Sequence, residues 1–320
     1  MKKVFPLIVG MLFLLLGASA WSQAYPSKPI RLIVPFAAGG GSDLTMRVMA
    51  TELGTGLGQS VFVENRPGVS GILGLDVLGQ SAPDGYTLMF FSNVTAIALR
   101  SQKRDFEPRK LFTGLGNAVL ATAILLVNPA VVNVRNVSEF NAFLRANPGT
   151  HYTSVGPGSP GNLLIAVLGV QNGFKVEHVP YKGIAPAMAD AAAGRVGIVI
   201  GDTNSARPHI QSGALRPIAA VASVRTPLLP DLPTSAEQGF PQFAYDSYNG
   251  LVVTAGTPAA IVERLRVATR RVVESPTFVE FVTKGGSRAV YMDGPQWEEL
   301  LLSDFQRWGE AIRVTGISPP

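Results

Sequence analysis

A glycine-rich stretch at residues 35–43, Pro-Phe-Ala-Ala-Gly-Gly-Gly-Ser-Asp, has residue types that could bind an anion. It follows an apolar run and precedes a segment with apolar residues at helical spacing. A strand, a glycine turn and a helix start present unpaired backbone N–H groups to an anion, and glycine lets another group approach the backbone closely. Ser42 or Asp43 is expected to cap the helix. The alternative is a tight strand-to-helix turn without a ligand.

A second stretch of this kind lies at residues 156–161, Gly-Pro-Gly-Ser-Pro-Gly. It follows a short predicted strand at residues 152–155 and precedes a predicted helix at residues 162–170. Ser159 as N-cap with Pro160 at the first helical position is a strong local start signal. Two such stretches in one chain favour an anion-binding function over coincidence.

The sequence lacks the common signatures of catalysis and of metal binding. His151, His178 and His209 are scattered, there is no cysteine, and no G-x-S-x-G, G-x-G-x-x-G or G-K-[ST] motif occurs. Asp43 and Asp202 are isolated carboxylates, each as well explained by bracing a loop. We therefore expect no metal, no cofactor and no enzymatic activity.

The first 24 residues resemble a cleaved signal peptide. Lys2 and Lys3 precede an apolar run from residue 4 to residue 17, and Ser22-Gln23-Ala24 ends the segment. The run is shorter than the roughly 18 apolar residues of a membrane span. Removal of the two lysines leaves 25 Lys+Arg against 22 Asp+Glu, because the full chain has 27 and 22, so the net charge falls from +5 to +3. We expect a periplasmic protein with no membrane anchor and no affinity for nucleic acid.

Predicted strands and helices alternate along the remaining chain, which indicates an α/β fold with mostly parallel sheets flanked by helices. We expect two lobes, with residues 25–122 and 246–320 in lobe I and residues 123–245 in lobe II. Strands are predicted at residues 30–36 and 121–127, and a helix over residues 259–273. Ligands bind beyond the carboxyl ends of such strands, so the loops that follow them should form one rim in each lobe. An aromatic stripe that includes Trp297 and Trp308 is expected to pack internally.

Short stretches along nearly the whole mature chain match one family in order. They are residues 25–30 (YPSKPI), 34–43, 63–68 (VENRPG), 82–87 (APDGYT), 179–183 (VPYKG), 232–234 (LPT) and 255–258 (AGTP). The chain resembles the Bug (TctC-like) extracytoplasmic solute receptors of bacterial tripartite tricarboxylate transporters. The resemblance implies a monomeric two-lobed periplasmic-binding-protein (Venus flytrap) fold that binds a small organic acid and delivers it to a membrane permease.

The resemblance also implies a ligand site between the lobes. Phe36 would form a wall, Gly39, Gly40 and Gly41 would donate backbone amides, and Asp43 would cap the helix or select for an amino group. The expected ligand contacts are Phe36, Ala37, Gly39, Gly40, Gly41, Ser42, Asp43, Asn65 and Ser92 in lobe I, with Ser154, Gly156, Gly158, Ser159, Tyr181, Lys182, Gly183, Asp202 and Thr203 in lobe II. Three positions depart from the family pattern, Ala38, Asn162 and residues 201–204, which leaves the identity of the ligand open.

Several residues have a structural alternative. Asp43 and Ser159 could serve only as helix caps, Lys182 could be a solvated charge, and Asp202 could orient a loop. Two other functions remain open for the same cleft: a ligand sensor that docks to a signalling protein, and a hydrolase or isomerase that uses serine or aspartate residues.

Overall fold

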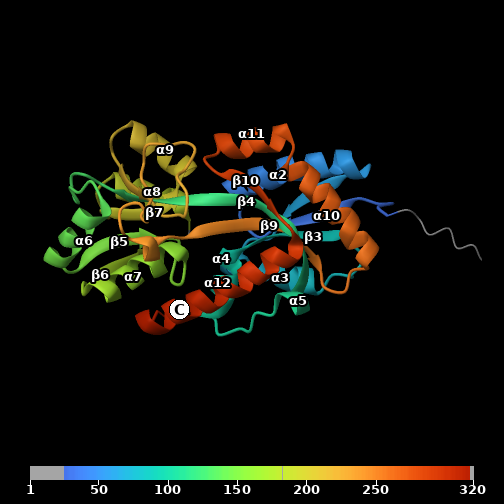
Figure 1. Cartoon of the computed structure of the whole chain (residues 1–320), viewed down its shortest axis with the longest axis horizontal. Coiled ribbons are helices and arrows are strands. Elements are labelled where there is room, and N and C mark those ends of the chain that lie inside the picture. The colour runs from blue at the N-terminus through green and yellow to red at the C-terminus, as the bar shows by residue number, and fades with distance from the viewer. Residues whose placement is uncertain (1–24, 182, 318–320) are drawn as a thin grey trace, which may run out of the picture.

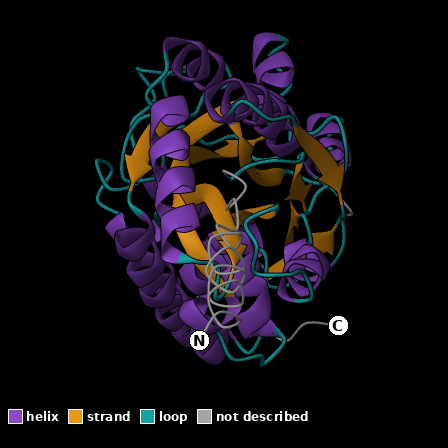
Figure 2. Cartoon of the chain, turned by 90° about the vertical axis from the view of Figure 1, so that its right-hand side faces the viewer, coloured by secondary structure: helices purple, strands orange, loops and turns teal. Residues whose placement is uncertain are grey.

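The computed structural model describes residues 25–181 and 183–317 (Figure 1). The predicted signal peptide at residues 1–24 and Lys182, one of the predicted ligand contacts, lie outside the described residues. Within the described ranges, the chain alternates strands with helices, and Figure 2 shows the strands surrounded by helices on several sides.

Ten strands form one continuous mixed sheet. Eight of them follow the order β2-β1-β3-β9-β4-β7-β5-β6, and β8 and β10 both pair with β4. The strands are β1 (Ile30–Val34), β2 (Val61–Asn65), β3 (Thr87–Ser92), β4 (Phe112–Val127), β5 (Thr150–Ser154), β6 (Val176–Pro180), β7 (Ile198–Asp202), β8 (Arg216–Ala220), β9 (Asp246–Thr254) and β10 (Arg288–Met292).

The helices cover both halves of this sheet. They are α2 (Gly41–Leu57), α3 (Ile72–Gly79), α4 (Asn93–Ser101), α5 (Pro108–Leu111), α6 (Val137–Ala146), α7 (Pro160–Asn172), α8 (Ile184–Ala192), α9 (Thr203–Gln211), α10 (Ala259–Val273), α11 (Pro276–Lys284) and α12 (Gly294–Thr315), with short 3₁₀ turns η1 (Val69–Gly71) and η2 (Pro241–Phe243). The α/β class with flanking helices is confirmed, but the prediction of mostly parallel sheets is wrong: the single sheet is mixed, because β4 and β9 pair antiparallel with each other and with all their other neighbours.

The long strand β4 joins the two halves of the molecule. Its residues from Phe112 to Thr122 pair with β9, and its residues from Ala123 to Val127 pair with β7. In Figure 1, β4 and β9 run across the middle of the molecule from one half to the other. We call the half that contains β1, β2, β3 and β10 lobe I, and the half that contains β5 to β8 lobe II.

The pairing directions make the carboxyl ends of the two sets of strands face each other. β3 and β4 are both antiparallel to β9, so β1, β3 and β4 run from lobe I toward lobe II. β7 is antiparallel to β4 and parallel to β5, so β5 and β7 run from lobe II toward lobe I. The loops that follow β1 and β3 therefore point toward the loops that follow β5 and β7.

Separate apolar clusters fill the space between the sheet and its helices. In lobe I, Met46, Met49 and Leu53 of α2 pack on β1, and each is fully buried. In lobe II, Phe140 of α6 and Leu163 of α7 belong to a second buried cluster. Apolar faces at helical spacing on both sides of the sheet thus hold the loops between them.

Helix α12 carries the predicted aromatic stripe and spans the lobes. Trp297 is fully buried against Phe91 in lobe I, with ring centroids 6.2 Å apart. Trp308 packs edge-on against Tyr245, 5.6 Å away, in the lobe II cluster. The expectation that the stripe packs internally is confirmed.

A buried polar cluster lies where β9 leaves lobe II. The Asn93 side chain donates to the carbonyl of Asp246 and to the carboxylate of Asp304, both at 2.9 Å, and accepts from the Tyr245 hydroxyl at 2.9 Å. Burial raises the pKa of Asp304 above its ordinary value. Asn93 therefore ties α4, α12 and the start of β9 together beside the Ser92 position.

Candidate functional site

The lobe I loop, residues 36–43, leads into the first turn of α2 as predicted, but the predicted cap is wrong. Gly40 is the N-cap, with no side-chain hydrogen bond, and Ser42 and Asp43 are the second and third helical residues. Asp43 instead reaches back along the chain and accepts the N–H of Gly39 at 2.9 Å. Its carboxylate therefore shapes the loop ahead of the helix.

Asp43 is the brace of this loop. It is 1% exposed, and besides Gly39 it accepts Nδ2 of Asn65 at 2.9 Å and Nε of Arg47 at 3.0 Å. Burial alone would raise the pKa of Asp43, but the hydrogen bonds from Arg47, Gly39 and Asn65 outweigh it and hold the pKa below 3.8. The carboxylate is thus ionised and bonded to three donors of the protein itself.

Asn65 and Phe36 complete the lobe I loop. Nδ2 of Asn65, at the end of β2, also donates to the carbonyl of Phe36 at 3.1 Å. The Phe36 ring is half-buried and meets Phe90 edge-on, with centroids 5.9 Å apart. The end of β2 therefore fixes both ends of the loop, while Ala37 remains exposed.

The hydrogen bonds divide the backbone amides of this loop into two groups. The N–H of Gly39 is used by Asp43, so the expectation that it contacts a ligand is not supported. Within the described chain, the N–H groups of Gly40, Gly41 and Ser42 have no hydrogen-bond partner, as is usual for the first turn of a helix. These three amides can bind an anion at the start of α2.

Ser154 is the first of two side chains that hold the lobe II loop, residues 154–159, by hydrogen bonds. Its Oγ lies 3.1 Å from the N–H of Gly156, 3.0 Å from Oγ of Ser159 and 2.7 Å from Nε2 of His178. Ser159 is the N-cap of α7 and Pro160 its first residue, so the predicted helix start is confirmed. The Ser159 hydroxyl, however, accepts no N–H of α7 and instead donates to the carbonyl of Gly156 at 2.7 Å.

Asn162 is the second side chain that holds the lobe II loop, and it binds Gly158. Its Oδ1 accepts the N–H of Gly158 at 2.9 Å, and its Nδ2 donates to the Tyr152 hydroxyl at 2.7 Å. Gly158 also packs against lobe I, because a Cβ there would lie 3.1 Å from Cβ of Ser101. The amides of Gly156 and Gly158 are thus internal, whereas in the first turn of α7, which follows this loop, the N–H groups of Gly161 and Asn162 have no partner among the described residues.

The remaining lobe II residues mostly brace their own loops. The N–H of Tyr181 donates to the carbonyl of Ser154 at 2.9 Å, and its hydroxyl donates to Asp190 at 2.5 Å. Asp202 caps α9 by accepting the N–H and the hydroxyl of Ser205 at 2.8 and 2.7 Å, which matches the structural alternative for this residue. Gly183 is the N-cap of α8.

Thr203 and Ser92 are both 2% exposed but differ in their contacts. Oγ1 of Thr203 lies 3.1 Å from Oγ1 of Thr226, which donates to the carbonyl of Gly286 in lobe I, so Thr203 belongs to an inter-lobe contact. Oγ of Ser92 has no hydrogen-bond partner in the described part of the chain. Ser92 ends β3, on the edge of lobe I that faces lobe II, and its unpartnered hydroxyl is buried there.

Four residues that support these loops were not predicted: Arg47, Tyr152, Asn162 as a brace, and His178. Arg47 could have been found from its i, i+4 spacing to Asp43. His178 could not, because it reaches Ser154 only through the pairing of β5 with β6.

Two cavities lie beside the helices that follow these loops. One, of about 430 Å³, lies between α2 and α10, and the other, of about 750 Å³, lies beside α7 and β6. The larger one is bordered by Tyr152, Asn162 and His178, and also by Pro157, which lies between the two glycines of the lobe II loop. No cluster of metal-ligating side chains occurs among the described residues. No helix in residues 25–181 or 183–317 is both long and apolar enough to cross a bilayer.

Comparison with known proteins identifies the family. Residues 45–317 match the model of the tripartite tricarboxylate transporter family receptor (TctC). Protein BugT of Bordetella pertussis is 31% identical over 94% of this chain and 93% of its own length. A UPF0065 protein of Pseudomonas sp. strain P51 is 33% identical over 91% of this chain and 87% of its own length.

Solved structures agree. The adipate complex of Rpa4515 from R. palustris superposes with a TM-score of 0.80 at 26% identity, covering 92% of this chain and 100% of that one. MatC from Rhodopseudomonas palustris with bound malate gives a TM-score of 0.78 at 26% identity, covering 90% of this chain and 100% of that one. The chain belongs to the tripartite tricarboxylate transporter receptor family, a family of periplasmic solute-binding proteins.

Proposed function

We propose that this receptor captures a small carboxylate between the lobe I loop and the lobe II loop and delivers it to a membrane permease. The observation that carries the proposal is the pair of opposed helix starts: α2 offers the free amides of Gly40, Gly41 and Ser42, and α7 offers those of Gly161 and Asn162. The strand directions aim both toward the space between the lobes.

The free energies are sufficient for such a function. A hydrogen bond to a charged group contributes about 1.5–3 kcal/mol, and a helix N-terminus adds about 0.3–2 kcal/mol. Four such contacts in a cleft that excludes water reach the roughly 8 kcal/mol of a micromolar complex. An arginine that touches the ligand is not required.

The ligand class is a carboxylic acid without an amino group. The carboxylate of Asp43 is 1% exposed and is bonded to Gly39, Arg47 and Asn65, so it is not presented to an ammonium group, contrary to the selective role expected for it. Malate and adipate, bound to the two similar structures, are both of this class. We therefore propose a mono- or dicarboxylate as the ligand of this chain.

The proposed receptor is exported and non-catalytic. Residues 1–24 would serve as a cleaved signal peptide. The mature chain would be a monomer of two lobes that move relative to each other: lobe I, of residues 25–122 and 246–320, and lobe II, of residues 123–245. The hydrolase alternative would rest on Ser154 and His178, but Ser154 is 2% exposed and engages Gly156, Ser159 and His178. Nothing in the contacts favours docking to a sensor over a permease.

Thermal unfolding of the full mature chain with malate, adipate, citrate, aspartate and the diamide of adipic acid tests the proposal. A carboxylate at about 1,000 times its Kd should stabilise the native state by about 4 kcal/mol and raise Tm by roughly 10 °C. The uncharged diamide should have no effect, and aspartate should bind more weakly than malate. No shift with any acid, or an equal shift with the diamide, would contradict the proposal.

A further inference from the structure

Strand β9 becomes accessible where it crosses between the lobes (Figure 1). Its residues from Gly250 to Thr254 are buried in lobe I, whereas the four residues before them, from Asp246 to Asn249, are each partly exposed. At Asn249, β9 still pairs with β3 on one side and with β4 on the other, so this residue is exposed through a face of the sheet and not at its edge. Asn249 therefore lies in the floor of the space between the lobes.

The alternation of side chains along β9 places Asn249 on the face of the sheet that α2 covers in lobe I. Leu251 and Val253 share that face, and both belong to the buried cluster under α2. Phe90 of β3 belongs to the same cluster, and Phe36, the first residue of the lobe I loop, meets it edge-on at 5.9 Å. Asn249 is the next residue along this face toward lobe II, which places it at the Phe36 end of the lobe I loop.

The Asn249 amide has one free acceptor. Its Nδ2 donates to the carbonyl of Ser247 at 3.2 Å and lies 3.4 Å from the Ser247 hydroxyl. Because a carbonyl oxygen can only accept, the contact with Ser247 also fixes which atom of the amide is Oδ1. Oδ1 has no hydrogen-bond partner among the described residues, and it is reached by solvent, unlike the buried hydroxyl of Ser92 on the opposite strand. Asn249 therefore presents an acceptor to the space between the lobes.

The strands around Asn249 favour a neutral donor as its partner. β3, β4 and β9 contain no lysine or arginine, so this floor could not neutralise a second carboxylate, which would also face the free Oδ1 unfavourably. Among acids without an amino group, the group that can donate to Oδ1 is a hydroxyl. If the lobes close over an acid that lacks this hydroxyl, Oδ1 loses water without gaining a partner, which weakens binding.

We propose that Asn249 is a specificity-determining residue that accepts a hydrogen bond from a hydroxyl group of the ligand, so that the receptor prefers hydroxycarboxylates to the same acids without the hydroxyl. The carboxylate of the ligand binds the free amides at the starts of α2 and α7, and its hydroxyl reaches the floor at Asn249. This selection rests on the proposed function, because it requires a carboxylate between the lobes. It goes further in naming the second group that the ligand must carry.

Pairs of acids that differ by one hydroxyl test the role of Asn249. Calorimetry on the mature chain measures Kd for malate and succinate, and for lactate and propionate. In the wild type, the acid without the hydroxyl should bind about tenfold more weakly, and in Asn249→Ala the two acids of a pair should have equal Kd. Both acids of a pair carry the same carboxylates, so general damage to the loops or to closure changes both Kd values and leaves their ratio unchanged.

Two further variants separate recognition of the hydroxyl from a structural role. Asn249→Asp keeps an acceptor and adds a negative charge, so it should retain the preference for the hydroxy acid while binding every acid more weakly. Asn172→Ala is the matched control, because Asn172 is a half-buried asparagine at the far end of α7 from the lobe II loop, where it donates to the carbonyl of Leu168 at 2.8 Å. It should show the same ratio of Kd values as the wild type.

The outcomes distinguish this role from the proposed function. Equal Kd values within each pair that binds the wild type, or a preference that persists in Asn249→Ala, would overturn the role of Asn249 and leave the proposed function intact. Binding of adipate without binding of either hydroxy acid would have the same meaning. Failure of every carboxylate to bind would overturn both.

Discussion

Replacing Asp43 with asparagine is expected to weaken carboxylate binding by about 30-fold. All three partners of this side chain, Gly39, Arg47 and Asn65, are donors, and an amide offers them one acceptor oxygen and an NH₂ group. The loss of one or two charge-assisted bonds costs about 2 kcal/mol of loop order. Apparent Kd rises in proportion to the fall in the binding-competent fraction, and calorimetry with malate or adipate measures it.

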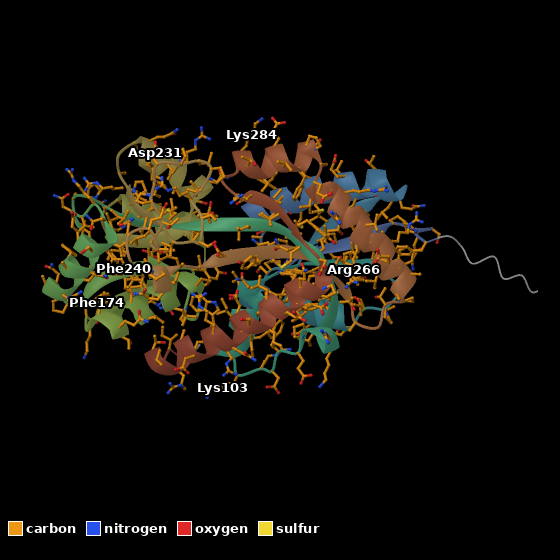
Figure 3. All side chains as sticks on the ribbon, in the orientation of Figure 1. Lys103, Phe174, Asp231, Phe240, Arg266 and Lys284 are labelled. Atoms are coloured by element: carbon orange, nitrogen blue, oxygen red, sulfur yellow. The ribbon has the colours of Figure 1, made fainter. Side chains whose placement is uncertain are left out.

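Asp231→Asn is the matched control for this change. Asp231 is exposed in lobe II and marked in Figure 3, and it takes part in no ion pair among the described residues. The same loss of one negative charge there should leave Kd unchanged. Equal affinities of the wild type and Asp43→Asn would show that Asp43 does not shape the loop that binds the ligand.

Replacing Gly250 with alanine is expected to destabilise the whole protein by about 3 kcal/mol. Gly250 lies in β9 opposite Asn117 of β4, and a Cβ there would lie 2.1 Å from the carbonyl oxygen of Gly116 and 2.7 Å from Cα of Asn117. Both are backbone atoms, so the added methyl group must push the two paired strands, β4 and β9, apart. Tm should fall by roughly 10 °C in thermal unfolding.

Gly56→Ala provides the comparison. Gly56 lies within α2, and a Cβ there would meet no atom within 4 Å. Alanine at an exposed helical position should stabilise the fold by about 0.5–1 kcal/mol. If Gly250→Ala also retained wild-type Tm, the close approach of β4 and β9 would not be a constraint on the structure.

The two glycine-rich stretches could be predicted from the sequence because their signals are local. Ser159 followed by Pro160 marks the start of α7, and the helix predicted over residues 259–273 is found as Ala259–Val273. The capping prediction for α2 was wrong because a short polar residue is only a preference for that position. Asp43 instead accepts hydrogen bonds from Asn65 and Arg47, and the pairing of β1 with β2 brings Asn65 close to Asp43.

The first half of β4 could not be predicted for a similar reason. The strand was expected over residues 121–127 and begins at Phe112. Gly114 and Gly116 suggest a loop locally, but the structure requires them, because a Cβ at Gly114 would lie 3.0 Å from the carbonyl of Gly294 and one at Gly116 would lie 2.7 Å from the Tyr291 ring. The carbonyl of Gly114 also accepts Nε and Nη2 of Arg266, marked in Figure 3, at 3.1 and 3.0 Å. These contacts join segments about 150 or more residues apart, which no local pattern reports.

Most of the predicted site residues lie in the two loops, but their roles differ from those expected. The amides of Gly39, Gly156 and Gly158 bind side chains of the protein, whereas the free amides lie one to four residues beyond Gly39 and Gly158, in the first turns of α2 and α7. The difference arises because each glycine turn is held by a side chain from the helix that it precedes. Asp43 of α2 and Asn162 of α7 do this equivalently in the two lobes.

Hydrogen exchange of these free amides with and without a bound carboxylate tests the central claim most directly. Using whichever acid raises Tm most, exchange should slow at Gly40, Gly41 and Ser42 and also at Gly161 and Asn162, because both helix starts would donate to the same ligand. Exchange around the cavity beside α10 should not change. Protection confined to one lobe, or to that cavity, would contradict binding between the two loops.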